Sequence, residues 1–270
     1  MIFTTITNSF YRKFSESIRE SIPALVETVL HVYNAVKTDL RPTPTKSFYT
    51  FNLRDISKVF QGICSASDKH CQDVVEIVRY WYHENMRVFH DRLTTEEDRT
   101  YLKEILNSQL PKFNLTLQQV MNTERLIIGD FMGNRDAEVK PYIQVKDLKE
   151  LLIKMNEFLD DYNSIVGGSK NQMKLVMFLD ACEHIARICR ILRQPQGNAL
   201  LLGVGGSGRQ SLAKMATFIS SYKLYQIEVI KGYNFNKWRD DLKLCLKQAG
   251  LENRPTTFLF VDTQIIDEQM

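Results

Sequence analysis

Apolar residues recur at helical spacing through the first half of the chain. In residues 17–40 they fall on one helix face, and the same spacing returns in residues 71–93. Pro42 and Pro44 lie between these segments, where they break the first helix and hold the link extended. Thr94 and Glu97 have the spacing of a capping box, which predicts a further helix over residues 95–110. The pattern therefore predicts an all-helical region at the start of the chain.

The pattern changes after Pro195. Residues 198–203 form a continuous apolar run that ends in a glycine turn, as in a buried parallel strand. A helical segment at 209–222 follows, then a β-rich segment at 224–230, a helix at 235–250 and a β-rich run at 256–262. This β-α-β-α-β order implies a parallel sheet with right-handed crossovers. Residues 111–143 are irregular, so we expect a domain junction there, and the predicted fold class is all-α plus α/β.

Composition narrows the class of protein. The chain has 270 residues, of which 44% are hydrophobic and 25% charged, the balance of a soluble globular protein. Its net charge of +3 does not by itself suggest a nucleic-acid or membrane surface. Five cysteines without a C-x-x-C pair argue against a disulfide framework or a zinc site. No segment reads as a signal peptide or a membrane span, so an intracellular protein is expected.

The glycine-rich stretch before the second helical segment carries the candidate chemistry. Gly203 and Gly208 have the spacing of a phosphate-binding loop, whose backbone N–H groups hold phosphates at a helix N-terminus. The usual lysine is replaced by Arg209 and the usual Mg²⁺-binding hydroxyl by Gln210, with Ser211 one residue late. The candidate phosphate-binding residues are therefore Gly203, Val204, Gly205, Gly206, Ser207, Gly208, Arg209, Gln210 and Ser211.

Two other interpretations of this loop stay open at this point. Gly203, Gly205 and Gly208 also match the dinucleotide pattern G-x-G-x-x-G, and Glu228 has the spacing of its ribose-binding acid, so a dinucleotide-binding oxidoreductase domain is an alternative. The loop could also be a tight turn without any ligand. Asp262, at the end of the last apolar run, favours the phosphate-binding interpretation because a Walker B carboxylate holds Mg²⁺ at that place.

Several long segments carry a family resemblance. They are PTPTKSFYTFNLRDISKVFQGI (42–63), YWYHENMRVFHDRL (80–93), LDACEHIARICRILRQPQGNALLLGVGGSGRQSL (179–212) and FLFVDTQI (258–265). In this order they resemble a dynein heavy chain, most closely the axonemal type. The first two resemble the lid of the third AAA+ module of the motor ring, and the last two resemble the start and the Walker B strand of the fourth module.

The resemblance implies an organisation and a function. Residues 1–125 would be the α-helical AAA+ lid subdomain, and residues 126–270 an incomplete P-loop NTPase domain with a parallel sheet, so the chain would be a fragment. The implied function is ATP-linked, microtubule-based movement of cilia or flagella, in the axonemal cytoskeleton. The implied partners are other AAA+ modules of the same ring, dynein intermediate and light chains, and microtubules reached through parts outside this chain. Neither nucleic acid nor a membrane is implied.

The resemblance also assigns roles to single residues. Arg54 matches the lid arginine that approaches the γ-phosphate of its own module's nucleotide. From the sequence alone, the alternative is a surface pair with Asp55 or another nearby acid. ATP or ADP would bind the glycine loop, with Mg²⁺ at Asp262. Thr263 stands where the family has a glutamate that polarises water, and a hydroxyl is no base near neutral pH. Together with Arg209 and Gln210, this predicts nucleotide binding without efficient hydrolysis.

Overall fold

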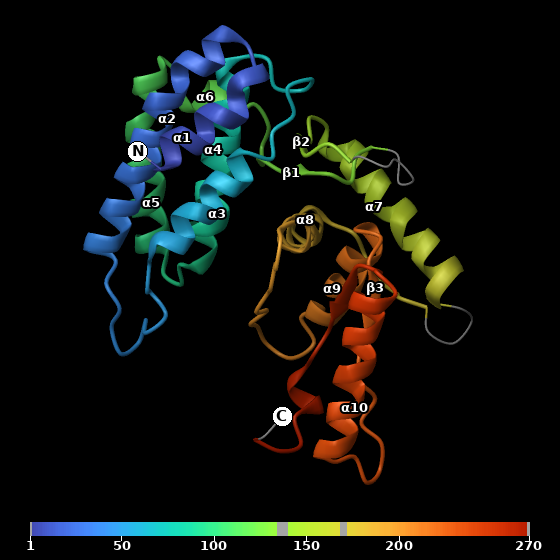
Figure 1. The fold of residues 1–270 in the computed structure, drawn as a ribbon. Coiled ribbons are helices and arrows are strands. Elements are labelled where there is room, and N and C mark those ends of the chain that lie inside the picture. Colours follow the sequence, from blue (N-terminus) through green and yellow to red (C-terminus); the bar gives the residue numbers. More distant parts are fainter. Residues whose placement is uncertain (1, 134–139, 168–171, 269–270) are drawn as a thin grey trace. The chain divides into compact units, whose positions relative to one another are not determined.

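The protein is described by a computed structural model that covers residues 2–133, 140–167 and 172–268 (Figure 1). The chain divides into two compact units, and the division falls between Lys146 and Asp147. Each unit is described by itself below. The domain boundary expected after residue 125 concerns the family's modules and stays a prediction.

The first unit is built from helices. They are α1 (Ile2–Phe10), α2 (Glu16–Asp39), α3 (Leu53–Ile63), α4 (Val74–Val88), α5 (Glu96–Gln109) and α6 (Leu117–Val120). The long helix α2 packs against α4 and α5, which lie beside it in Figure 1. Its apolar face is the one that the spacing predicts, since Ile18, Leu25 and Val29 are fully buried. A short antiparallel pair, β1 (Ile128–Gly129) with β2 (Ile143–Gln144), completes this unit.

Side chains at the helix starts explain where these helices begin. Asn52 caps α3: its side chain accepts the Arg54 N–H at 2.8 Å, while the Asp55 carboxylate accepts the Asn52 N–H at 2.9 Å. The cap of α5 is Thr95 and not Thr94, so the expected capping box is wrong by one residue. The Thr94 N–H instead donates to the Tyr49 hydroxyl at 2.9 Å, a contact that no local pattern encodes.

The second unit combines helices with a small parallel sheet. Its helices are α7 (Leu148–Tyr162), α8 (Leu179–Arg193), α9 (Arg209–Ile219) and α10 (Phe235–Leu246). Helices α7, α8 and α9 pack together, with Tyr162 and Phe218 in edge-to-face contact at 5.4 Å between ring centroids. The strands β3 (Lys223–Tyr225) and β4 (Thr256–Phe258) pair in parallel, which places the α10 crossover between them.

The first expected strand does not form. Residues 198–203 have no regular secondary structure and pair with no described strand, and the side chains of Leu200 and Leu202 are 83% and 81% exposed. The two strands that form are also shorter than the β-rich runs 224–230 and 256–262. A strand is defined by the partner that satisfies its backbone groups, and the described chain provides none for this apolar run. The parallel arrangement is thus present for two of the three expected strands, and the right-handed crossover stays a prediction.

Two further observations limit the classes of site. Among the described residues, no helix is long and apolar enough to cross a membrane. Within the same residues, no cluster of three or more His, Cys, Asp or Glu side chains is arranged to hold a metal ion. The five cysteines are free, and burial raises the pKa of Cys182 to about 11, which keeps that thiol protonated near neutral pH.

Candidate functional site

The glycine loop adopts a conformation that depends on its glycines. Gly206 and Gly208 have φ angles of 77° and 78°, in the left-handed region that side chains with a Cβ rarely enter. A Cβ on either glycine would meet no atom within 4 Å, so backbone conformation and not space demands glycine there. Between them, the Ser207 N–H closes a turn onto the Val204 carbonyl at 3.3 Å. The loop therefore has a defined turn conformation and does not continue as a strand.

Helix α9 begins directly after this loop. Gly208 is its N-cap, and no side chain caps the free N–H groups of its first turn. The first turn also contains no acidic residue. Uncapped N–H groups and the positive end of the helix dipole favour an anion at this place. The local geometry thus agrees with the phosphate-binding interpretation.

Arg209 lies across its own loop. Its guanidinium donates to the Leu201 carbonyl at 3.4 Å through Nη1 and to the Val204 carbonyl at 3.3 Å through Nη2. The Arg209 Cδ lies 3.5 Å from the place that a Cβ on Gly203 would take, an ordinary packing distance, so the arginine side chain lies next to this glycine. The positive charge expected at this position is therefore in the loop and is already hydrogen-bonded there.

The two residues after Arg209 show no ligand arrangement. Gln210 is exposed and Ser211 is half-buried, and neither side chain makes a hydrogen bond within the described part of the chain. Gln210 occupies the position at which a hydroxyl would bind Mg²⁺ beside Asp262. We expect its amide group to be a weaker Mg²⁺ ligand there than that hydroxyl. The structure therefore places all nine loop residues, 203–211, in one continuous segment, but it gives the hydroxyl of Ser211 no special position.

Asp262 follows the sheet in a short turn. Strand β4 ends at Phe258, and Asp262 begins a 3-10 turn with its carboxylate exposed. Its Oδ1 accepts the Thr263 N–H at 3.0 Å, and no hydrogen bond or ion pair among the described residues joins it to the glycine loop. The turn is held by buried Gln264, whose Nε2 donates to the Ile227 carbonyl at 2.6 Å. Sequence analysis did not single out Gln264, because nothing in the local pattern marks it as an anchor.

Glu228 lies outside the strand in which it was expected. It was expected within the second strand, but β3 ends at Tyr225 and Glu228 is exposed in the irregular segment that follows. The end of β3 is tied instead to α10, because Tyr225 and Tyr233 both donate to the Asp241 carboxylate. Burial and this carboxylate together raise the pKa of Tyr225 to about 12. This cluster joins the end of β3 to α10, and Glu228 takes no part in it.

Arg54 lies in the first turn of α3, in the helical unit. Its side chain is exposed and makes no hydrogen bond or ion pair among the residues that the structure describes. The expected alternative, a surface pair with Asp55, is wrong because Asp55 pairs with Arg92, at 3.1 Å between Nη1 and Oδ1. Arg92 also donates to the carbonyls of Phe48 and Thr50 at 3.2 and 3.3 Å. Arg54 thus extends from a turn that Arg92 holds in place.

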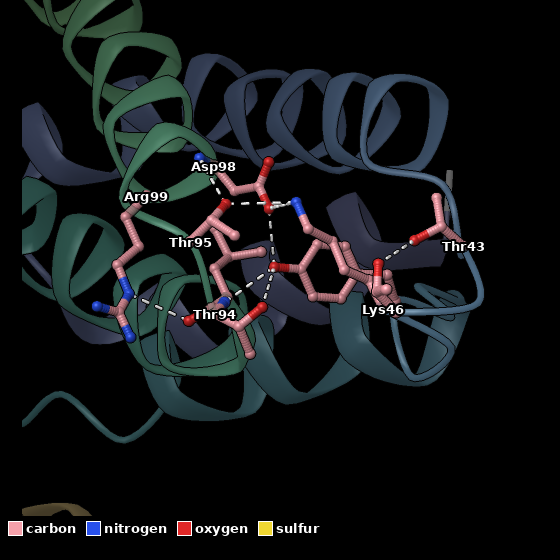
Figure 2. A network of polar contacts seen from close by, with 9 residues as sticks. Thr43, Lys46, Thr94, Thr95, Asp98 and Arg99 are labelled. Carbon is pink, nitrogen blue, oxygen red and sulfur yellow. Dashed lines mark hydrogen bonds and ion pairs between the residues drawn. The ribbon is translucent and has the colours of Figure 1, made fainter.

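A second set of contacts holds the same loop further back. Figure 2 shows Lys46 and Thr95 beside Asp98, the residue at which the loop between α2 and α3 meets α5. Tyr49 donates to Asp98 at 2.9 Å and accepts the Thr94 N–H. Burial alone raises the pKa of Asp98, but hydrogen bonds with Lys46, Thr95 and Tyr49 outweigh it and hold that pKa below its ordinary value. The segment that leads to Arg54 is therefore anchored at two places.

Comparison with known families matches both units. The family described as "Dynein heavy chain, ATPase lid domain" matches residues 6–99, and "P-loop containing dynein motor region D4" matches residues 173–270. The chain belongs to the dynein heavy chain family. This confirms the resemblance and the fold class, a helical lid followed by part of a P-loop domain. Neither match supports the dinucleotide-binding oxidoreductase alternative, which is therefore abandoned.

Individual dynein heavy chains show the same relationship over nearly the whole chain. Dynein axonemal heavy chain 1 of Mus musculus is 44% identical over 263 residues, which is 94% of this chain and 6% of the relative. Dynein axonemal heavy chain 6 of Homo sapiens is 40% identical over 272 residues, or 99% of this chain and again 6% of the relative. The chain spans about 6% of the length of these curated relatives. Both relatives are axonemal dyneins by name.

Proposed function

We propose that this dynein chain contributes the lid of one AAA+ module and the phosphate loop of the next to a motor ring in the axoneme of a cilium or flagellum. The whole protein would drive microtubule-based movement there. Its immediate partners would be the other AAA+ modules of the same ring. Intermediate and light chains and microtubules would be partners of parts of the heavy chain outside these residues.

The conformation of the glycine loop carries the nucleotide-binding part of this proposal. Two left-handed glycines lead into the uncapped start of α9. The D4 region that matches this unit is described as containing a P-loop. Backbone N–H groups so arranged bind the phosphates of a nucleotide, so ATP or ADP is the proposed ligand of residues 203–211. NAD is not expected to bind.

Mg²⁺ would enter this site with the nucleotide. Asp262 offers an exposed carboxylate, and the described residues hold no preformed metal cluster. Mg²⁺ is ordinarily held by one or two carboxylates together with substrate phosphates, so a single aspartate fits a site that the nucleotide completes. The metal would supply charge neutralisation on the phosphate oxygens.

We further propose that the module binds nucleotide without efficient hydrolysis. The position after Asp262, where the family has a water-activating glutamate, is held by Thr263, whose exposed hydroxyl is no base near neutral pH. Gln210 takes the place of the hydroxyl ligand. Arg54 would act elsewhere, on the nucleotide of the lid's own module, for which a guanidinium that is exposed and has no ion pair among the described residues is suited.

Equilibrium binding of ATP, ADP and NAD to the 270-residue chain, with Mg²⁺ present, tests the proposed ligand. We expect ATP and ADP to bind, NAD not to bind, and Gly208→Val to abolish binding, because valine cannot adopt a φ of 78° without strain. Gly250→Val is the matched control, since a Cβ there meets no atom within 4 Å and its φ is not left-handed. If no nucleotide bound the unaltered chain, the module would be a structural part of the ring instead.

A further inference from the structure

The guanidinium of Arg209 has two possible sets of partners, and the structure shows one of them. Nη1 and Nη2 donate to the carbonyls of Leu201 and Val204, on the two sides of Gly203. A Cβ at Gly203 would lie 3.5 Å from the Arg209 Cδ and 3.7 Å from its Nε, so the arginine lies directly over this glycine. The residue that would attract phosphates is thus bound to the backbone of the loop that would hold them.

We propose that Arg209 is a latch that closes the phosphate loop in the nucleotide-free chain and must leave the Leu201 and Val204 carbonyls before phosphates can take its place. This inference rests on the proposed nucleotide binding and deepens it. A guanidinium has five N–H groups, and two of them, one on Nη1 and one on Nη2, are engaged by the loop carbonyls. A phosphate that is to be held by this same pair of groups must displace both carbonyls. In the proposed binding mode, entry of the nucleotide therefore exchanges one set of hydrogen bonds for the other.

The latch depends on arginine and would not form with the usual lysine. A lysine has a single ammonium on a flexible stem, so it can meet one of the two carbonyls but cannot span Gly203 as a fork does. Both side chains carry one positive charge, so electrostatic attraction of a nucleotide is the same for both. When the binding-competent state is only partly populated, apparent affinity and association fall by that fraction. Arg209 would therefore slow nucleotide entry compared with a lysine.

Stopped-flow binding of a fluorescent ATP analogue tests this exchange. We expect Arg209→Lys to raise the apparent association rate constant about tenfold, which corresponds to about 1.4 kcal/mol of latch free energy. Arg239→Lys is the matched control: it makes the same chemical change on the exposed face of α10, and it should leave the rate unchanged. An Arg209→Lys rate constant equal to or below that of the unaltered chain would overturn the latch.

A second measurement needs no nucleotide. The Ser207 N–H makes the loop's internal hydrogen bond to the Val204 carbonyl, the same carbonyl that Arg209 holds. We expect amide hydrogen exchange at Ser207 to become about tenfold faster in Arg209→Lys, and to be unaffected in Arg239→Lys. Unchanged Ser207 exchange would refute the latch even where nucleotide binds. If no nucleotide bound either protein, the proposed ligand would be wrong, and Ser207 exchange would still decide whether the latch exists.

Discussion

Arg92 should be a large single contributor to the stability of the helical unit, although its side chain is 32% exposed. It pairs with Asp55, donates to the carbonyls of Phe48 and Thr50, and lies 4.8 Å from the centroid of the Phe51 ring. In Arg92→Met the Asp55 carboxylate, only 10% exposed, would keep its backbone bond from Asn52 and lose its ion pair. A hydrogen bond to a charged group contributes about 1.5–3 kcal/mol when buried, and partial exposure reduces this.

We therefore expect Arg92→Met to lower the free energy of unfolding of this unit by about 2 kcal/mol. The chain has two tryptophans, and Trp81 lies fully buried in this unit, whereas Trp238 belongs to the other. In a Trp238→Phe background, Trp81 fluorescence during urea titration reports on the helical unit by itself. Arg19→Met is the matched control, because Arg19 is exposed on α2 and its side chain makes no hydrogen bond or ion pair within the described structure.

Arg92→Lys separates charge from geometry in the same titration. It keeps a positive charge beside Asp55 and loses the fork that reaches two backbone carbonyls, so its unfolding midpoint should fall between those of the unaltered chain and Arg92→Met. Equal midpoints for Arg92→Met and Arg19→Met would refute the reasoning. In that case the loop before α3 would be held by the Lys46 and Asp98 contacts and not by Arg92.

Three further predictions concern the two units separately. Hydrogen bonding holds the pKa of Asp98 below its ordinary value, so its contribution to stability is present above the unfolded pKa and is lost as the pH falls through the folded pKa. Lys46→Met should therefore make the free energy of unfolding, measured by urea titration at a series of pH values, fall less steeply with acid. An unchanged dependence on pH would contradict this. Steady-state ATP turnover by the chain should equal the background and be unaffected by Asp262→Ala, and turnover that this substitution abolished would show that the module hydrolyses ATP. The double substitution Leu200→Ser with Leu202→Ser should reduce self-association measured by light scattering, because both apolar side chains are exposed. For the same reason it should change the free energy of unfolding by less than about 0.5 kcal/mol. Unchanged scattering would mean that these two leucines do not mediate self-association.

Sequence patterns predicted best those features that depend only on residues close together in the chain. The apolar face of α2 follows from helical spacing alone. The residues that this spacing places on the face are all buried, namely Ile18, Ile22, Leu25, Val26, Val29 and Val36. Thr28, Val32 and Tyr33 are buried as well and were not expected. A glycine loop was expected at residues 203–208 from residue type, and the structure adds that Gly206 and Gly208 have φ angles near 78°, a region that favours glycine. Neither feature needs information about distant parts of the chain.

Other features failed or were missed because they depend on distant partners. Residues 198–203 have the composition of a strand, but a strand needs a neighbouring backbone, and composition does not say which one. The cap of α5 moved from Thr94 to Thr95 because the Thr94 N–H is taken by Tyr49, far away in sequence. The pairing of Asp55 with Arg92 in place of Arg54 has the same cause. A single sequence contains no signal for such choices.

The two arginines proposed to contact nucleotides differ in the hydrogen bonds and ion pairs that they make in the structure. Arg54 has no ion pair among the described residues, and the neighbouring Asp55 is paired with Arg92. Arg209 is bound by two carbonyls of its own loop. A contact from Arg54 to a nucleotide of the lid's own module therefore needs no bond to break, whereas a contact from Arg209 does. Under the proposed function, Arg54 of the lid can contact its own module's nucleotide directly. The phosphate loop that follows binds its nucleotide slowly, because Arg209 must first release the two loop carbonyls.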